Sequence, residues 1–179
     1  MQKAKELDSL LQLSNKPMLT GCYIFRKIEN KEIIFIPRSK NKHSWPVEID
    51  QAIRLKQYQL KEVGKAARAA IIICEQYPLI DIEEPVSVVK KELGYNWNKG
   101  KLEKLYESVD LISNPEADIV RPAGHIIKNG YTISPSKARD GAFRSTTADP
   151  EFYLPMDCSD EELGETVIKA FDVVKDMAD

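Results

Sequence analysis

The stretch FYLPMDCSDEELGETVIKAFDVV, residues 152–174, predicts a short strand followed at once by a helix. Its first three residues, Phe152–Leu154, favour a β-strand, and Pro155 ends that strand because proline cannot donate to a ladder of hydrogen bonds. Ser159 stands three residues before Glu162, the spacing of a capping box, so we expect the helix to begin after Ser159. Apolar residues then recur mostly three or four positions apart and predict one buried stripe, made of Leu163, Val167, Ala170, Phe171, Val174 and Ala178.

This end of the chain is strongly acidic. Residues 149–179 hold ten acidic residues against two lysines, a net charge of −8, whereas residues 1–148 hold 24 basic residues against 18 acidic ones, a net charge of +6. An exposed acidic face can attract a basic protein from a distance. A solvated helix face that keeps its charges for solubility has the same composition. The sequence leaves both interpretations open.

The first half of the chain predicts a short helix, a hairpin and a long helix. Residues 6–13 read as an amphipathic helix. Strands over residues 22–28 and 32–36 are expected to pair around a turn at 29–31, with Pro37 as their end and an exposed basic loop over 38–42. The longest helix is predicted from Asp50 to about Gln76. Its middle lets a sheet or another helix approach closely because it is rich in small residues, namely Gly64, Ala66, Ala67, Ala69 and Ala70.

The second half predicts short helices and then strands. The helices are expected over residues 86–93 and 101–108, and the strands over 109–112, 117–121, 125–128 and 131–134. Asn129-Gly130 predicts a hairpin turn between the last two strands, and the polar residues 135–151 predict a long loop. The fold class is therefore α+β, with a mixed, mainly antiparallel sheet packed against a long central helix and a C-terminal helix. A length of 179 residues fits one domain over residues 1–179, with or without a small helical subdomain over 85–108.

Residues that could carry catalysis are scarce. His43 and His125 are far apart and belong to no metal-binding spacing, and the chain has no phosphate-binding loop, dinucleotide motif or serine nucleophile elbow. Cys22, Cys74 and Cys158 are widely spaced and predict reduced thiols. No apolar run approaches the roughly 20 residues that cross a bilayer, and no leader pattern opens the chain. We therefore expect a cytoplasmic protein that is not an enzyme and binds no cofactor and no metal.

Two segments of this sequence resemble a known family. GYTISPSKARDGAF (residues 130–143) and FYLPMDCSDEELGETVIKAF (residues 152–171) resemble immunity proteins of bacterial contact-dependent growth inhibition systems. In that family a strand with a dipeptide turn and a proline-containing strand precede a long loop, a strand ending in Leu-Pro, and a closing helix that opens with an Asp/Glu-Glu-Leu-Gly motif. The resemblance covers about the last 50 residues. Where such helices usually close with an arginine-containing tail, this chain has Val173, Val174, Lys175 and Asp176.

The resemblance implies a protein that binds a partner without chemistry of its own. Such a protein neutralises a cognate toxin domain, most often a nuclease and here with an RNase favoured, by covering the active site or an exosite. Together with the acidic end of the chain, this predicts a toxin-binding surface made of Asp157, Asp160, Glu161, Glu165 and Arg144. The alternative is a nucleic-acid-binding regulatory protein that uses a lysine-rich helix pair over residues 86–108. The pI of about 5.8 and the long connection between these helices disfavour a phosphate-binding role, and no membrane partner is expected.

Overall fold

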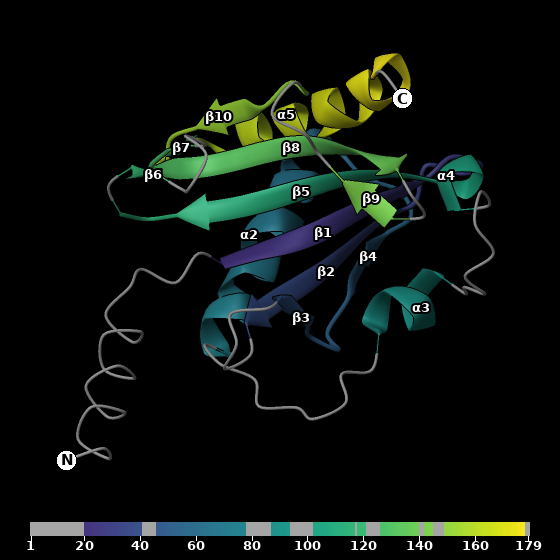
Figure 1. The fold of residues 1–179 in the computed structure, drawn as a ribbon, viewed down its shortest axis with the longest axis horizontal. Helices are drawn as coiled ribbons and strands as arrows, with labels where there is room; N and C mark the ends of the chain where they lie inside the picture. The colour runs from purple at the N-terminus through teal and green to yellow at the C-terminus, as the bar shows by residue number, and fades with distance from the viewer. Residues whose placement is uncertain are drawn as a thin grey trace.

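The computed structural model describes residues 20–40, 46–77, 87–93, 102–116, 118–120, 126–139, 142–144 and 149–177. These residues form an eight-stranded antiparallel sheet of order β10-β8-β5-β1-β2-β3, in which β4 also pairs with β2 and β9 with β8 (Figure 1). Its strands are β1 (Thr20–Lys27), β2 (Ile33–Lys40), β3 (Pro46–Glu48), β4 (Ile53–Leu55), β5 (Tyr106–Asn114), β8 (Gly130–Arg139), β9 (Ala142–Arg144) and β10 (Phe152–Leu154). A separate pair is formed by β6 (Ile119–Val120) and β7 (Ile126–Ile127). The helices are α2 (Leu60–Gln76), α3 (Val88–Leu93), α4 (Leu102–Leu105), α5 (Asp160–Val173) and the 3-10 turn η1 (Val174–Asp176).

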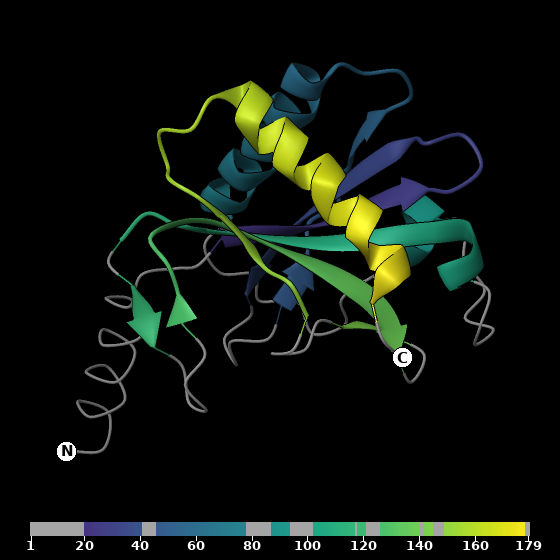
Figure 2. The ribbon, with the colours of Figure 1, turned by 90° about the horizontal axis from the view of Figure 1, so that it is seen from above.

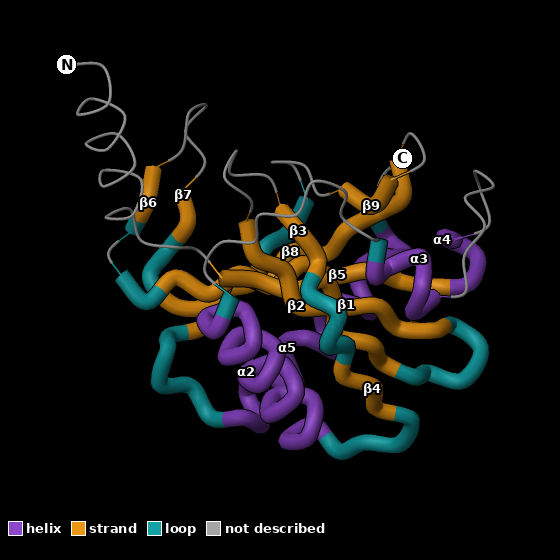
Figure 3. Tube along the Cα trace, turned by 90° about the horizontal axis from the view of Figure 1, so that it is seen from below, coloured by secondary structure: helices purple, strands orange, loops and turns teal. Residues whose placement is uncertain are grey.

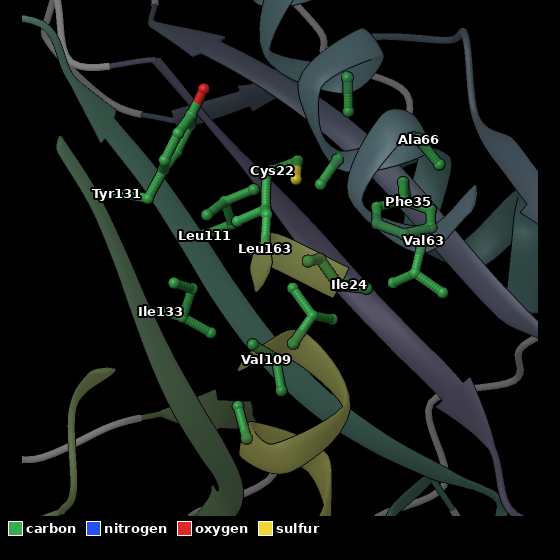
Figure 4. Packing of buried hydrophobic residues seen from close by; sticks show 14 of the residues in the cluster. Cys22, Ile24, Phe35, Val63, Ala66, Val109, Leu111, Tyr131, Ile133 and Leu163 are labelled. Atoms are coloured by element: carbon green, nitrogen blue, oxygen red, sulfur yellow. The ribbon is translucent and has the colours of Figure 1, made fainter. Parts of the chain in front are cut away.

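The period of two along the strands gives the sheet two different faces. Figures 2 and 3 show α2 and α5 on one side of the sheet and α3 on the other. On the α2 and α5 side, inward-facing strand residues meet the two helices in the main core, drawn in Figure 4, and include Cys22, Ile24, Phe35, Val109, Leu111 and Ile133. The intervening residues Phe25, Ile34 and Ile36 form a smaller cluster with Val88, Val89 and Leu93 of α3. The predicted α+β class, with an antiparallel sheet packed against a long helix and a C-terminal helix, is confirmed.

The two main helices touch backbone to backbone. A Cβ atom built on Gly64 of α2 would lie 1.8 Å from the carbonyl oxygen of Asp160, and one built on Gly164 of α5 would lie 1.8 Å from that of Leu60. Each glycine thus packs directly against a backbone carbonyl in the first turn of the other helix. Any larger residue would force the helices apart, so this pair of glycines sets their separation.

The C-terminal strand and helix lie where the sequence predicts them. The Ser159 hydroxyl accepts a hydrogen bond from the Glu162 amide, and the Glu162 carboxylate accepts one from the Ser159 amide at 2.7 Å, which completes the capping box. The apolar stripe of α5 is buried through Leu163, Val167, Ala170 and Phe171, and continues to Val174 in η1. Ala178 and the predicted helix over residues 6–13 lie outside the described residues.

The start of the long helix was predicted ten residues too early. Residues 50–59 are not helical, and Ile53–Leu55 form β4 against β2. The helix begins at Leu60 because Gln59 and Glu62 form a second capping box there. Its predicted end at Gln76 is confirmed. Apolar residues spaced by two, such as Ile53 and Leu55, suit a strand better than the helical period.

The sequence predicted that Pro37 ends the second strand, and this prediction is wrong. Pro37 lies within β2 opposite Cys22, and its carbonyl accepts a hydrogen bond from the Ile49 amide at 2.8 Å. The N–H and C=O of one strand residue point to the same side. The backbone N–H that proline lacks would therefore point away from β1. On that side, residues 33–35 of β2 pair with β4 and residues 38–40 pair with β3, and Pro37 lies between these two pairings. Residues 38–40, predicted as an exposed loop, are part of the strand.

The Asn129-Gly130 turn is real, but it does not close the predicted hairpin. The strand before it, β7, pairs with β6, whereas β8 after it pairs with β5 and β10. Gly130 has a φ of 118°, and a Cβ there would lie 2.2 Å from the Leu154 carbonyl oxygen. The turn thus carries the chain from the small sheet into the large one.

Most of the described residues in the long loop predicted over residues 135–151 belong to strands. Pro135 lies inside β8 opposite Val109, β8 runs on to Arg139, and β9 pairs with its end. Residues 140, 141 and 145–148 lie outside the described part. The predicted helix over 101–108 is also wrong beyond Leu105, because β5 begins at Tyr106. In the helix pair proposed for nucleic acid binding, the second helix, α4, is therefore only four residues long.

Gly64→Ala should test the contact between α2 and α5. Helix propensity alone would make this change stabilising by about 1 kcal/mol. Overlap with the Asp160 carbonyl should instead cost about 1–3 kcal/mol net, because the helices must separate. The urea unfolding midpoint measures the difference. Lys65→Ala, at the exposed next residue, should stay within about 0.5 kcal/mol of wild type, and equal stability of the Gly64 variant would contradict the close approach.

Glu162→Gln should show how much the negative charge of Glu162 contributes to the stability provided by the α5 capping box. Hydrogen bonds from the amide and the hydroxyl of Ser159 lower the pKa of Glu162. Because the folded-state pKa lies below the unfolded one, the ionised carboxylate stabilises the fold at neutral pH, and this contribution is lost as the pH falls through the folded-state pKa. Wild type should therefore be more stable than the variant at pH 7, and the difference should vanish once the pH lies below the lowered folded-state pKa. Thermal unfolding across pH checks this, and in a Ser159→Ala background the difference should shrink; a gap that persists in acid would contradict the explanation.

Candidate functional site

A groove of about 740 Å³ opens where the β1–β2 turn and the start of α2 face α5. Basic residues from the turn side and from α2 line it, namely Arg26, Lys31 and Lys61, and acidic residues of α5 line the other side, namely Glu161 and Asp172. The remaining lining residues are Tyr58, Gln59, Leu60 and Ile168. We call this the α2–α5 groove. Its mixture of apolar and charged side chains around a concave surface makes it the candidate site.

Arg26 forms the buried base of the α2–α5 groove. Its Nε donates to Glu107 Oε2 at 2.5 Å, its Nη2 donates to Asp172 Oδ1 at 2.9 Å, and its guanidinium carbon lies 4.7 Å from the centre of the Phe171 ring. The side chain of Arg26 is only 6% exposed and that of Glu107 4%. Burial alone would lower the pKa of Arg26, but the hydrogen bonds to Glu107 and Asp172 raise it, so the guanidinium stays charged.

Local hydrogen bonds fix the side of the groove opposite α5. The Tyr58 hydroxyl donates to the Lys31 carbonyl at 3.0 Å, which ties the β1–β2 turn to the segment before α2. The capping box of Gln59 and Glu62 then sets where α2 starts and hence where Leu60 and Lys61 stand. The groove is therefore a product of the two helix starts and one turn.

The structure separates the acidic residues that the sequence predicted as one surface. Glu161 lies in the α2–α5 groove. Asp160 is half-buried, and its Oδ1 accepts a hydrogen bond from Arg68 Nε at 2.8 Å, so it has a structural partner on α2. Glu165 and Asp157 are exposed and do not line the groove.

Arg144 does not lie beside these carboxylates. It is in β9, opposite Lys137 of β8. Lys137 Nζ donates to the Met177 carbonyl, beyond the C-terminal end of α5. The acidic residues are at the other end of this 14-residue helix, about 20 Å away along its axis. Arg144 and Glu161 therefore lie toward opposite ends of α5.

Sequence reasoning missed most of the groove. Tyr58, Leu60 and Lys61 were placed within one continuous helix, and Lys31 was read only as a turn residue. Arg26 did carry a usable signal, because it follows Cys22 and Ile24 at a spacing of two and must face the same, helix-covered side of the sheet. A charge at such a position requires a buried partner, and Glu107 fills that role.

A second charged pair lies on the opposite face of the sheet. Arg38 Nη1 is 3.3 Å from Asp110 Oδ1, and the Arg38 guanidinium lies 4.3 Å from the centre of the Tyr23 ring. Burial raises the pKa of Asp110, and the positive charge of Arg38 partly offsets this shift. Arg38 was expected in an exposed loop, but it is a largely buried strand residue that anchors a polar part of this face.

Other candidate chemistry finds little support in the part of the chain that the structure describes. No three His, Cys, Asp or Glu side chains gather there into a group that could hold a metal ion. Cys22, Cys74 and Cys158 are buried free thiols, and burial raises the pKa of each. His43 and His125 lie outside the described residues. Within those residues, no helix is both long and apolar enough to cross a membrane.

A double-mutant cycle should show that Arg26 and Glu107 depend on each other. Arg26→Met or Glu107→Leu alone should destabilise the fold by about 3–5 kcal/mol, because each leaves a buried charge without its buried partner, and the exposed Asp172 compensates Arg26 only in part. The double variant should recover most of that loss. Urea unfolding measures the stability of wild type, the two single variants and the double variant. Lys27→Met, which removes an exposed ion pair with Glu29, serves as the control and should cost less than about 1 kcal/mol; strictly additive losses would contradict the coupling.

Comparisons with known proteins concern the fold. A protein of unknown function from Neisseria meningitidis, NMB0488, has a TM-score of 0.59 and 18% identity, covering 88% of this chain and 96% of that one. A chain of the CdiA-CT/CdiI toxin and immunity complex from Yersinia pseudotuberculosis has a TM-score of 0.57 and 14% identity, covering 86% of this chain and 96% of that one. No protein-family model and no curated protein matches this chain. The described fold is therefore similar, over nearly its whole length, to folds already seen in solved structures.

Proposed function

We propose that this chain is an immunity protein that binds and neutralises a toxin domain of a contact-dependent growth inhibition system. The observation that carries the proposal is the similarity of its fold, over 86% of its length, to a chain of a toxin and immunity complex. The motifs in residues 130–143 and 152–171 support the same family independently of the fold. At 14% sequence identity, this similarity supports assignment to the immunity proteins and does not specify the toxin.

Neutralisation of this kind needs a tight complex and no catalysis. The immunity protein would occupy the cytoplasm before the toxin arrives, because a single free toxin molecule turns over many substrates. A nanomolar dissociation constant corresponds to about −12 kcal/mol of binding free energy. A rigid surface favours such affinity, since little conformational entropy is then lost on binding. The capped helices and hydrogen-bonded turn around the α2–α5 groove fit this requirement.

The target within this proposal is a nuclease, with an RNase favoured. Family resemblance supports it, and so does the acidic end of the chain, since a surface that binds nucleic acid is basic. The complex would cover the active site or an exosite of that domain. Asp157, Glu161 and Glu165 are exposed and could meet a basic surface. Asp160 contributes less to this role because Arg68 already neutralises it.

Co-expression in bacteria should test this function. The chain should restore growth to cells that express the C-terminal domain of the effector encoded immediately upstream of it, and purified samples of the two should form a complex with nanomolar affinity or better. It should fail to protect against a panel of unrelated toxin domains, because unpaired charges and clashes exclude the wrong partners. An immunity protein of a different system serves as the matched control. Protection against the whole panel, or against none, would count against the proposal.

A further inference from the structure

Apart from the Arg26–Asp172 pair at its base, the two sides of the α2–α5 groove carry charges of opposite sign that do not meet. In the described part of the chain, no ion pair or side-chain hydrogen bond links Lys31, Lys61 or Glu161 to another side chain. All three residues are exposed. Asp172 is 65% exposed while it pairs with Arg26, so a second cation can still approach it. The groove therefore presents an acidic wall on α5 and a basic wall formed by the turn and α2.

Apolar side chains also line both walls of the groove. Leu60 is 36% exposed, and Tyr58 and Ile168 are partly exposed beside it. Most of the other large apolar side chains of α2 and α5 are buried in the core. A volume of about 740 Å³ exceeds what one side chain fills, and it falls within the range of sites that hold ligands of several groups.

Lys31 occupies an unusual backbone conformation at the rim of the groove. Its φ is 60°, in the left-handed region that glycine or asparagine normally takes. The Asn30 side chain accepts a hydrogen bond from the Glu32 amide, and the Tyr58 hydroxyl binds the Lys31 carbonyl, so this conformation is held firmly. A residue with a long cationic side chain where glycine would be less strained suggests that the side chain is kept for binding.

We propose that the α2–α5 groove receives a protruding segment of the toxin domain in which an apolar side chain stands between a basic and an acidic one. The basic residue would face Glu161 and Asp172, the acidic one would face Lys31 and Lys61, and the apolar one would cover Leu60 and Ile168. This inference rests on the proposed function and narrows it, because the whole acidic face of α5 no longer matters equally. A nucleic acid is a poorer occupant, since Glu161 and Asp172 would repel its phosphates.

Matched pairs of charge reversals can test the groove. Glu161→Lys and Lys61→Glu change its two walls, and Asp176→Lys and Lys65→Glu make the same changes at exposed residues outside it. The probe is the purified toxin domain that wild type neutralises in co-expression. Each groove variant should raise the dissociation constant at least about tenfold, since like charges would then oppose each other. Each control should change it by less than about threefold.

Lys31→Gly separates binding from folding. Glycine adopts a φ of 60° without strain, so the melting temperature of this variant should equal or exceed that of wild type. Its affinity for the toxin domain should nevertheless fall at least about fivefold, because the basic wall loses one of its charges. Unchanged affinity in Lys31→Gly and in both groove reversals would overturn the groove and leave the proposed function intact.

Two further outcomes decide between occupants. Equal weakening by the groove variants and their controls would assign binding to the acidic face as a whole and overturn the groove. Binding of a single-stranded RNA oligonucleotide that is lost in Lys31→Gly and Lys61→Glu, but kept in Glu161→Lys, would overturn the inference in favour of nucleic acid. If wild type neither protects cells nor binds the toxin domain, the proposed function falls together with the groove.

Discussion

The contact between Gly64 and Gly164 constrains the rest of this structure. Each glycine lies against a backbone carbonyl of the other helix, so α2 and α5 approach each other more closely than a side chain at either position would allow. Both contacts use first-turn residues, so the two capping boxes stand near the crossing. A crossing at this point fixes where each helix starts, and the two starts in turn define the α2–α5 groove.

The net charge of the C-terminal segment overstates the negative charge that the folded protein exposes there. The C-terminal region has a net charge of −8, yet some of its carboxylates pair with basic residues in the fold, as Asp160 does with Arg68 and Asp172 with Arg26. Arg68 also donates to the Tyr131 hydroxyl and to the Cys158 carbonyl, which ties α2 to β8 and to the segment before α5. Part of the acidic excess therefore stabilises the fold, and the exposed remainder includes Glu161 and Glu165.

Local signals in the sequence predicted local structure well. The strand at Phe152–Leu154, the Ser159 cap and the stripe of α5 each depend on residues within a few positions of one another. Errors arose where a partner far along the chain decides the outcome: Pro37 can lie inside β2 because its missing donor faces a gap between β3 and β4. The groove combines residues near positions 26–31, 58–61 and 161–172, and only tertiary packing brings these together. Of the predicted surface, Glu161 alone belongs to it.

The pairing of distant segments has a consequence for synthesis on the ribosome. β1 pairs with β5, about 85 residues later, and α2 meets α5 after about 100 residues, so a half-made chain can pack α2 on β1 and β2 but lacks the strands and the helix that complete the main core. Since α5 follows every other described helix and strand except η1, the part of the apolar face that α5 covers stays exposed until the end of synthesis. Such a topology favours a slow, late and all-or-none acquisition of the native state. A cell would then depend on its stock of finished molecules rather than on nascent ones.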